Sequence, residues 1–275
     1  MHITVMPSKS WSRCICETLP LITEQTQNHL ETGNYKEIRL EESQVINLII
    51  EKTKCKYGNL DFFSDVTNIP RTDNLNFDRY YIAREILRTD LGFENDKKPG
   101  DFDVIIIPAF KEKIFFQYTS AFEVKVVRPT NKNYRRNSNS LGTTQTFGII
   151  EDGFPLVGLM QVCMNEPVTP KHFQYLPNLD NVSEIITFDP FPIYSIETQY
   201  ERILKTELPK YVGINVFGLS FNQEEKLVMQ DSSKFLNFKR GHFNPNFKES
   251  TVEKVKAHFE NRPNEYVVKI NNQNN

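Results

Sequence analysis

The sequence predicts an α/β protein with a mixed central sheet flanked by helices, and three observations lead to that prediction. Two short, nearly continuous apolar runs, 103–109 and 156–164, have the length and composition of buried strands. A longer run at 114–127 is rich in β-branched and aromatic residues, as strands are. Segments with apolar residues at helical spacing precede and separate these runs. At 275 residues, the chain is long enough to bury such a core without disulfides.

The elements follow in order along the chain. Residues 1–35 show no clear period, whereas 40–54 has the apolar spacing of a helix. A second helix is predicted at 77–91, because apolar residues recur on one side and Gly92 follows as a stop signal. The strand at 103–109 comes next, then the strand at 114–127, with a bulge expected at 119–120. A helix at 141–151 and the buried strand at 156–164 complete this part of the chain.

Beyond Pro167 the periodicity of apolar residues becomes weaker. Strands are predicted at 182–188 and 211–221, with a helix at 196–206 between them, and a helix at 251–261 precedes a last strand at 265–270. We therefore expect three regions. Residues 1–76 form a helical segment packed on the core, 77–167 form the core, and 168–275 form a C-terminal extension or a substrate-binding lobe.

Charge and cysteine content restrict the cellular setting. The net charge of −2 excludes a globally basic nucleic-acid binder but allows a local basic surface beside an acidic site. The four cysteines form no CxxC pair, which is typical of reduced thiols in a cytoplasmic protein. No apolar run reaches the ~18 residues of a membrane span, and none of signal-peptide length follows Lys9 and Arg13. We expect a cytoplasmic protein without a membrane partner.

Three charged residues stand within the predicted strands. Asp103 begins the first buried strand, and Glu123 and Lys125 lie two residues apart in the second, so they share one face. A buried charge without a partner costs several kcal/mol, roughly, and two carboxylates repel unless a cation lies between them. Mg²⁺ prefers such oxygen ligands, often one or two carboxylates together with water and substrate phosphate. The pattern therefore indicates a magnesium site with a lysine beside it.

An acid-x-Lys triplet alone has little specificity, because the chain contains three of them, beginning at Asp96, Glu123 and Glu224. Only the triplet at Glu123 lies within an apolar run and has a strand-borne Asp about twenty residues upstream. Asp101 is an alternative to Asp103, since both point the same way along the strand, but Asp103 lies deeper in the apolar run.

With these residues in place, the segment 77–164 resembles the PD-(D/E)XK nuclease superfamily, which has the restriction-endonuclease-like fold. The matching motif is Asp103 in G-D-F-D-V-I, followed by Glu123-Val124-Lys125 on the next strand. The resemblance implies that Asp103, Glu123 and the Val124 carbonyl bind Mg²⁺, for which Mn²⁺ can substitute. It also implies that Lys125 assists the attack of water.

The resemblance extends to two further residues. Members of the superfamily often carry a Glu on the helix before the first strand, and Glu85 fits that position, where it would bind metal or orient the other ligands. Some branches carry a Gln on the following helix, and Gln145 fits. The chain departs from that branch because Ile149 stands where a Tyr is expected.

The implied activity is Mg²⁺-dependent hydrolysis of phosphodiester bonds, with DNA as the expected substrate. Stand-alone proteins of this superfamily commonly serve in restriction, defence or mobile-element biology. A basic loop follows the catalytic strand and would grip phosphates, while its tyrosine stacks on a base; the residues are Arg128, Lys132, Tyr134, Arg135 and Arg136. A solvated loop is the alternative interpretation. A homodimer or a partner protein is also compatible with the sequence.

Two other functions remain open. The chain would be a binding or scaffold protein if the nuclease core were catalytically inactive. It would be an unrelated α/β interaction protein if the triplet were an accidental ion pair on a strand face. Metal binding separates the accidental pair from the other two, because such a pair does not select Mg²⁺ or Mn²⁺. The basic and aromatic stretch 234–248 fits a nucleic-acid surface and also an ordinary strand with buried aromatics.

Overall fold

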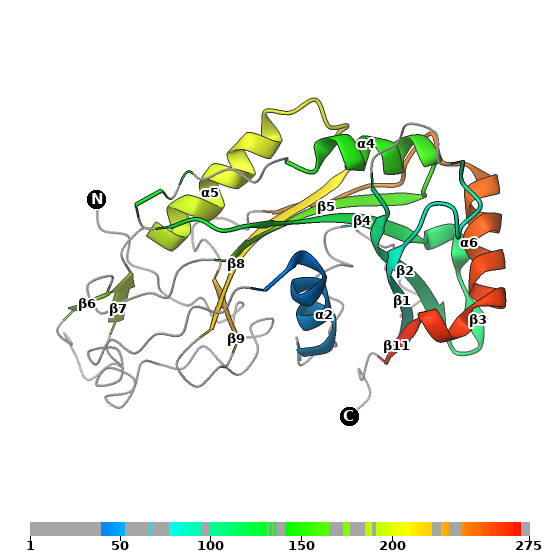
Figure 1. Ribbon diagram of the computed structural model, residues 1–275, viewed down its shortest axis with the longest axis horizontal. Helices are drawn as coiled ribbons and strands as arrows, with labels where there is room; N and C mark the ends of the chain where they lie inside the picture. The colour runs from blue at the N-terminus through cyan, green and yellow to red at the C-terminus, as the bar shows by residue number, and fades with distance from the viewer. Residues whose placement is uncertain are drawn as a thin grey trace.

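A mixed α/β fold surrounds one large sheet in the computed structural model of the chain (Figure 1). The structure describes residues 40–52, 67, 77–94, 100–130, 132–133, 135, 141–164, 173–176, 185–188, 191–221, 227–230 and 238–270. The main path of the sheet has the strand order β10-β8-β5-β4-β2-β1-β11. This arrangement confirms the predicted class, a mixed central sheet flanked by helices.

The centre of the sheet changes from antiparallel to parallel pairing at β4. Strands β1 (Arg79–Ile86), β2 (Phe102–Phe110) and β4 (Ser120–Val127) are antiparallel neighbours. Helix α4 (Thr143–Asp152) then connects β4 to β5 (Leu156–Met164), which lies parallel to β4. Strand β8 (Gly213–Phe221) continues the parallel part beside β5.

Segments from the C-terminal third belong to the same sheet. Strand β11 (Val267–Ile270) pairs with β1, and β10 (Phe238–Lys239) and β9 (Leu227–Gln230) pair with β8. Strand β3 (Lys113–Ile114) pairs with β2, whereas β6 (Phe173–Leu176) and β7 (Ile185–Phe188) form a separate two-stranded sheet. Residues 168–275 therefore supply strands to both edges of the central sheet.

Helices cover both faces of the sheet. Figure 1 shows α2 (Glu42–Lys52) on one side, and α4 and α5 (Phe191–Leu204) on the other, with α6 (Glu249–Asn261) at the end near β1. Apolar residues of α2, such as Ile46 and Ile49, pack in one core with Val104, Phe122 and Val124. The opposite face packs against α4, α5 and α6 in two further cores. Because both faces are covered, β2 and β5 are apolar almost throughout.

The helix predicted at 77–91 is wrong, since this segment forms β1 and a turn at 88–92. Its apolar residues belong to both faces of a strand: Tyr80 and Ile82 pack in the core beneath α2, while Ala83 packs in the opposite one. Two-sided burial removes the alternation by which a strand is recognised, and the remaining apolar spacing resembles a helix.

The strand predicted at 114–127 is interrupted. It contains β3, a 3-10 helix η2 (Phe116–Tyr118) and β4 instead of one bulged strand. A 3-10 helix η4 (Pro263–Glu265) joins α6 to β11. None of the helices in the described parts of the chain has both the length and the apolarity to cross a membrane. The segment 1–35, for which no element was predicted, lies outside the described residues.

Candidate active site

Asp103, Glu123 and Lys125 come together where β2 and β4 separate. The ladder between these strands ends at the pair Val104 and Phe122, so Asp103 and Glu123 are the next residues on each side. The Asp103 carboxylate bridges the gap, because its Oδ2 accepts a hydrogen bond of 2.6 Å from the Val124 amide. The structure thus places the aspartate beside the Glu-Val-Lys segment.

Lys125 joins two glutamates from different parts of the chain. Its Nζ lies 2.7 Å from Glu123 Oε1 and donates a 2.9 Å hydrogen bond to Glu42 Oε1. The second oxygen of Glu42 accepts a hydrogen bond of 3.2 Å from the Val126 amide. Glu42 stands at the start of α2, so this helix is fastened to β4 through the ammonium group and the backbone of the strand.

The two central carboxylates are hard to ionise in this environment. Burial raises the pKa of Asp103 above its usual value, although the Val124 amide and Lys125 act in the opposite direction. Burial also raises the pKa of Glu123, which is 1% exposed, and the neighbouring charge of Asp103 raises it further. Neighbouring buried acids with raised pKa values are a recognised property of functional sites.

Lys125 remains the positive group of the site. Burial alone would lower the pKa of its ammonium, but the charge of Glu123 and the hydrogen bonds to Glu123 and Glu42 raise it above the usual value. The positive charge is therefore retained at neutral pH, so that Lys125 can stabilise negative charge on a bound group.

The amino end of α4 packs directly on the site. Gly142 precedes the helix with φ of +78°, and a Cβ there would lie 3.0 Å from Lys125 Cγ and 3.2 Å from Glu123 Cγ. Only glycine combines this backbone conformation with so close an approach. No side chain caps this helix end, whose partial positive charge favours nearby carboxylates.

Glu85 lies near Asp103, but not on a helix as predicted. It stands in β1 between the pairs Arg84–Val104 and Ile86–Phe102, and is therefore opposite Asp103 in the antiparallel ladder. Its side chain is exposed, its φ is +51°, and its charge contributes to the raised pKa of Asp103. The prediction of a helix failed for the reason given for β1, whereas the proximity to Asp103 arises from strand pairing.

Gln145 lies in the first turn of α4 and is partly buried. A Cβ at Gly100 would lie 3.4 Å from Gln145 Cγ, so the glutamine contacts the segment that leads into β2. The helix on which it was predicted is present. Gln145 thus lies beside Gly100, just before the start of the strand that carries Asp103.

The basic loop is described in part. Arg128 directs its guanidinium to the Leu40 carbonyl and thereby holds the segment before α2. Lys132 and Arg135 are exposed, and the Arg135 carbonyl accepts a 2.9 Å hydrogen bond from Arg202 on α5. Tyr134 and Arg136 lie outside the described residues.

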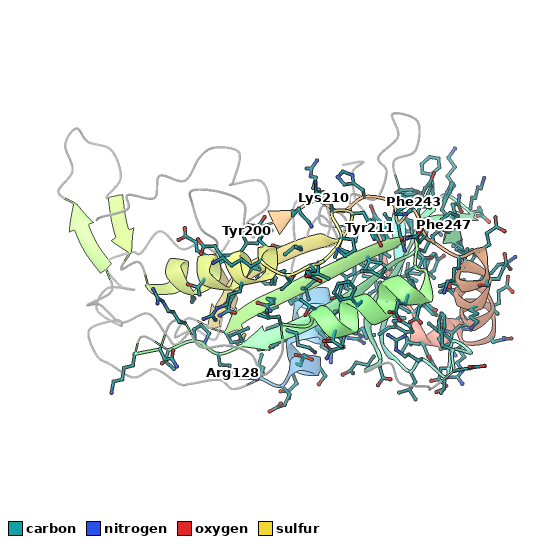
Figure 2. All side chains as sticks on the ribbon, turned by 90° about the horizontal axis from the view of Figure 1, so that it is seen from above. Arg128, Tyr200, Lys210, Tyr211, Phe243 and Phe247 are labelled. Carbon is teal, nitrogen blue, oxygen red and sulfur yellow. The ribbon has the colours of Figure 1, made fainter. Side chains whose placement is uncertain are left out.

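Figure 2 shows Arg128 and the aromatic pair Phe243 and Phe247 well apart. Arg128 follows the end of β4, whereas Asn244, between the two phenylalanines, is hydrogen-bonded to Phe154 and Pro155 before β5 begins. Because β4 and β5 are parallel, these groups belong to opposite ends of the sheet. The described part of the stretch 234–248 is therefore remote from the predicted phosphate-binding loop.

Glu42 is a site residue that sequence reasoning missed. A glutamate in the first turn of a helix is ordinary, because it complements the helix dipole. Nothing local connects it with Lys125, from which it is separated by 83 positions. The prediction of a helix over 40–54 was the only available signal, and it identified the element without its packing partner.

The donor set fits a small oxygen-preferring cation. Asp103 and Glu123 lie side by side, both carboxylates are disfavoured as anions by burial, and Glu85 and Glu42 add negative charge nearby. Within the described ranges, no group of three or more His, Cys, Asp and Glu side chains has an arrangement suited to a metal ion. Mg²⁺ is commonly held by one or two carboxylates with other oxygens, so two carboxylates meet that requirement.

Comparison with protein-family models, with curated proteins and with solved structures gives no match to this chain.

Proposed function

We propose that the protein is a Mg²⁺-dependent nuclease of the PD-(D/E)XK type that hydrolyses phosphodiester bonds, with DNA as its substrate. The observation that carries this proposal is the buried pair Asp103 and Glu123 with Lys125 in contact, at the point where β2 and β4 separate. A strand-face ion pair needs one acid and one base. An ion pair therefore does not explain the second buried acid. A role as a cation ligand explains both acids.

The residues have separate roles in the proposed reaction. Asp103 and Glu123 would hold Mg²⁺ together with the Val124 carbonyl, and Mn²⁺ can take its place. The bound cation supplies charge neutralisation at the phosphate and activation of water. Lys125, held between Glu123 and Glu42, stabilises the negative charge that develops on the phosphate oxygens. Glu42 fixes the direction of the ammonium group, and Glu85 adds negative charge beside Asp103.

The basic loop and the cellular setting belong to the same proposal. The exposed Lys132 and Arg135 would contact phosphates of the substrate, an attraction that weakens as salt is raised. Arg128 contributes mainly by holding α2, since its guanidinium is bonded to Leu40. We place the protein in the cytoplasm, in a restriction or defence role, acting alone, as a homodimer or with a partner protein.

A cleavage assay tests the proposal. Labelled duplex DNA, single-stranded DNA and RNA are incubated with the wild-type protein in Mg²⁺, in Mn²⁺ and in EDTA. The same reactions are repeated with Asp103→Asn and Glu123→Gln, which preserve side-chain shape and remove the charge. We expect cleavage by the wild type that EDTA stops, and a loss of at least about 100-fold in rate in both variants.

Loss of cleavage in the two site variants excludes contamination, because a contaminating nuclease would act in every preparation. Lys111→Ala, at an exposed lysine in the β2–β3 turn, is purified in parallel as a control substitution away from the site. This control should cleave like the wild type. Equal rates in the wild type, Asp103→Asn and Glu123→Gln would contradict the proposal. Cation binding without cleavage would instead favour the inactive scaffold.

A further inference from the structure

Gln161 is the immediate neighbour of Lys125 in the sheet. It lies on β5 in parallel register with Lys125, so the two side chains share the face that carries Glu123. Its side chain is 0% exposed, and the residues two positions away on the same face, Leu159 and Cys163, are apolar and buried. A fully buried amide in this row requires an explanation.

The nitrogen end of this amide holds the entry to α4. Gln161 Nε2 donates a hydrogen bond of 3.1 Å to the Leu141 carbonyl. Leu141 directly precedes Gly142, the residue that packs against the side chains of Lys125 and Glu123. Gln161 therefore holds the segment 141–142 that packs on the candidate site, and its own amide is buried beside that segment.

The oxygen end of the amide has no hydrogen-bond partner among the described residues, although the atom is buried. Leaving a buried acceptor unsatisfied destabilises the folded protein, and such atoms are normally paired with protein or ordered water. The ammonium of its neighbour in the sheet, Lys125, is already engaged by Glu123 and Glu42. Gln161 Oε1 is thus an acceptor for a donor that enters the site.

The chemistry of the proposed reaction identifies that donor. A phosphodiester carries no hydrogen on its phosphate oxygens and cannot donate to Oε1, whereas water can. A glutamine that accepts a hydrogen bond from the attacking water is an established way of orienting it in phosphoryl transfer.

We propose that Gln161 binds and orients the water that is consumed in hydrolysis, an inference that rests on the proposed nuclease function. The water oxygen forms the new bond to phosphorus as the bond from phosphorus to the leaving oxygen breaks. One proton of the water passes to solvent and the leaving oxygen takes one from solvent, so no further reactant is needed. Gln161 accepts a hydrogen bond in this step and does not itself exchange a proton.

The kinetic test uses Gln161→Met, which keeps the length of the side chain and removes both ends of the amide. We expect kcat to fall by about 10- to 100-fold while KM stays within roughly twofold, because the lost interaction is made to water and not to the nucleic acid. Cys163→Ala is the matched control, since Cys163 is equally buried, two residues away on the same strand and face. It should lose thermal stability without this drop in kcat.

A crystal structure of the wild-type protein at high resolution gives a readout that does not depend on activity or on the stability of a variant. We expect an ordered water about 2.7–3.2 Å from Gln161 Oε1. A solvent-free environment around Oε1, or a Gln161→Met variant with wild-type kcat, would overturn this role for Gln161 alone. A wild-type protein that cleaves no nucleic acid would overturn the proposed function, and the role in hydrolysis with it.

Discussion

At the scale of single residues, acidic side chains outnumber basic ones among the described residues that interact at the candidate site. Asp103 and Glu123 are buried together, Glu42 and Glu85 raise the pKa of Asp103 through their charges, and Lys125 is the cation in contact with Glu123. Burial of like charges destabilises a folded protein, and a bound cation relieves that effect. The composition of the site is therefore better explained by cation binding than by stability.

Glu42 allows a prediction about this charge balance. Glu42→Gln keeps the length of the side chain but removes its charge-assisted bond to Lys125, so the ammonium becomes less fixed. We expect cleavage to slow by about tenfold, with a change in unfolding free energy below about 1 kcal/mol because Glu42 is partly exposed. Glu41→Gln is the control, since the Glu41 side chain is exposed and the hydrogen bonds described for this residue are made by its backbone. Equal slowing in both variants would show that the contact to Lys125 is irrelevant.

A buried histidine gives a prediction about pH. His258 is enclosed, with Nδ1 2.9 Å from the Tyr266 hydroxyl, and Glu265, Arg262 and Asp90 are the charged groups that act on it. Burial lowers its pKa below the usual 6.5, so as pH falls the unfolded chain binds a proton at this histidine before the folded protein does. Above about pH 6.5 the histidine is neutral in both states and does not affect stability. As pH falls below that value, protonation of the unfolded chain lowers the free energy of unfolding by at most about 1.4 kcal/mol per pH unit.

The measurement is chemical denaturation between about pH 7.5 and about pH 5.5, roughly one unit on either side of the usual histidine pKa. His258→Gln should lose less stability over this range than the wild type, because the glutamine does not titrate. A variant whose stability falls as steeply as that of the wild type would refute the assignment to His258.

At the scale of elements, helix α4 is the part whose placement matters most for the site. The chain enters it through Gly142, with φ of +78°, against Lys125, Glu123 and Leu159. Gly92 also has a positive φ, of +71°, but nothing lies within 4 Å of the position of its Cβ. The two glycines share a backbone requirement and differ in their surroundings.

This difference yields a matched pair of substitutions. Gly92→Ala should cost about 1–2 kcal/mol of unfolding free energy, from backbone strain alone. Gly142→Ala should cost more and also slow cleavage at least about tenfold, because its methyl group displaces the side chains of the site. Thermal unfolding and initial rates measure the two effects. Unchanged activity in Gly142→Ala would mean that the entry to α4 does not determine the geometry of the site.

The elements also explain what could be predicted from sequence. The strands β2 and β5 and the helices α2 and α4 were predicted close to their observed bounds. Each is an apolar or periodic run whose ends are marked by turn residues in the sequence. Asp103, Glu123 and Lys125 could be grouped because they lie on neighbouring strands. Strand β1 was mistaken for a helix, since burial on both faces removes alternation. Glu42 and Gln161 were missed because only tertiary packing brings them to Lys125.

At the scale of the whole molecule, a buried ion pair connects distant segments. Arg88, in the turn after β1, donates to the Gly100 carbonyl before β2, at 2.8 Å, and to the Asp152 carboxylate at the end of α4. Its guanidinium lies 4.7 Å from the centre of the Phe102 ring, and the Asp152 carbonyl accepts from Thr251 on α6. Both charged side chains are 3% exposed.

Breaking this pair should destabilise the whole molecule. Arg88→Met removes the guanidinium that neutralises the buried Asp152 carboxylate, at a cost of about 3–5 kcal/mol. The double variant Arg88→Met with Asp152→Asn should be more stable than Arg88→Met, because no charge is then buried alone. Denaturant unfolding of the three proteins measures both differences. A double variant less stable than Arg88→Met would contradict the assigned coupling.

Cation binding tests the central claim most directly, because it requires neither the correct substrate nor a partner protein. The melting temperature is recorded with increasing Mn²⁺ for the wild type, Asp103→Asn and Glu123→Gln. A ligand at 100 times its dissociation constant stabilises the folded state by about 2.7 kcal/mol, which corresponds to a rise of several degrees. We expect that rise in the wild type and its loss in both variants. The same response in all three proteins would contradict a metal site at Asp103 and Glu123.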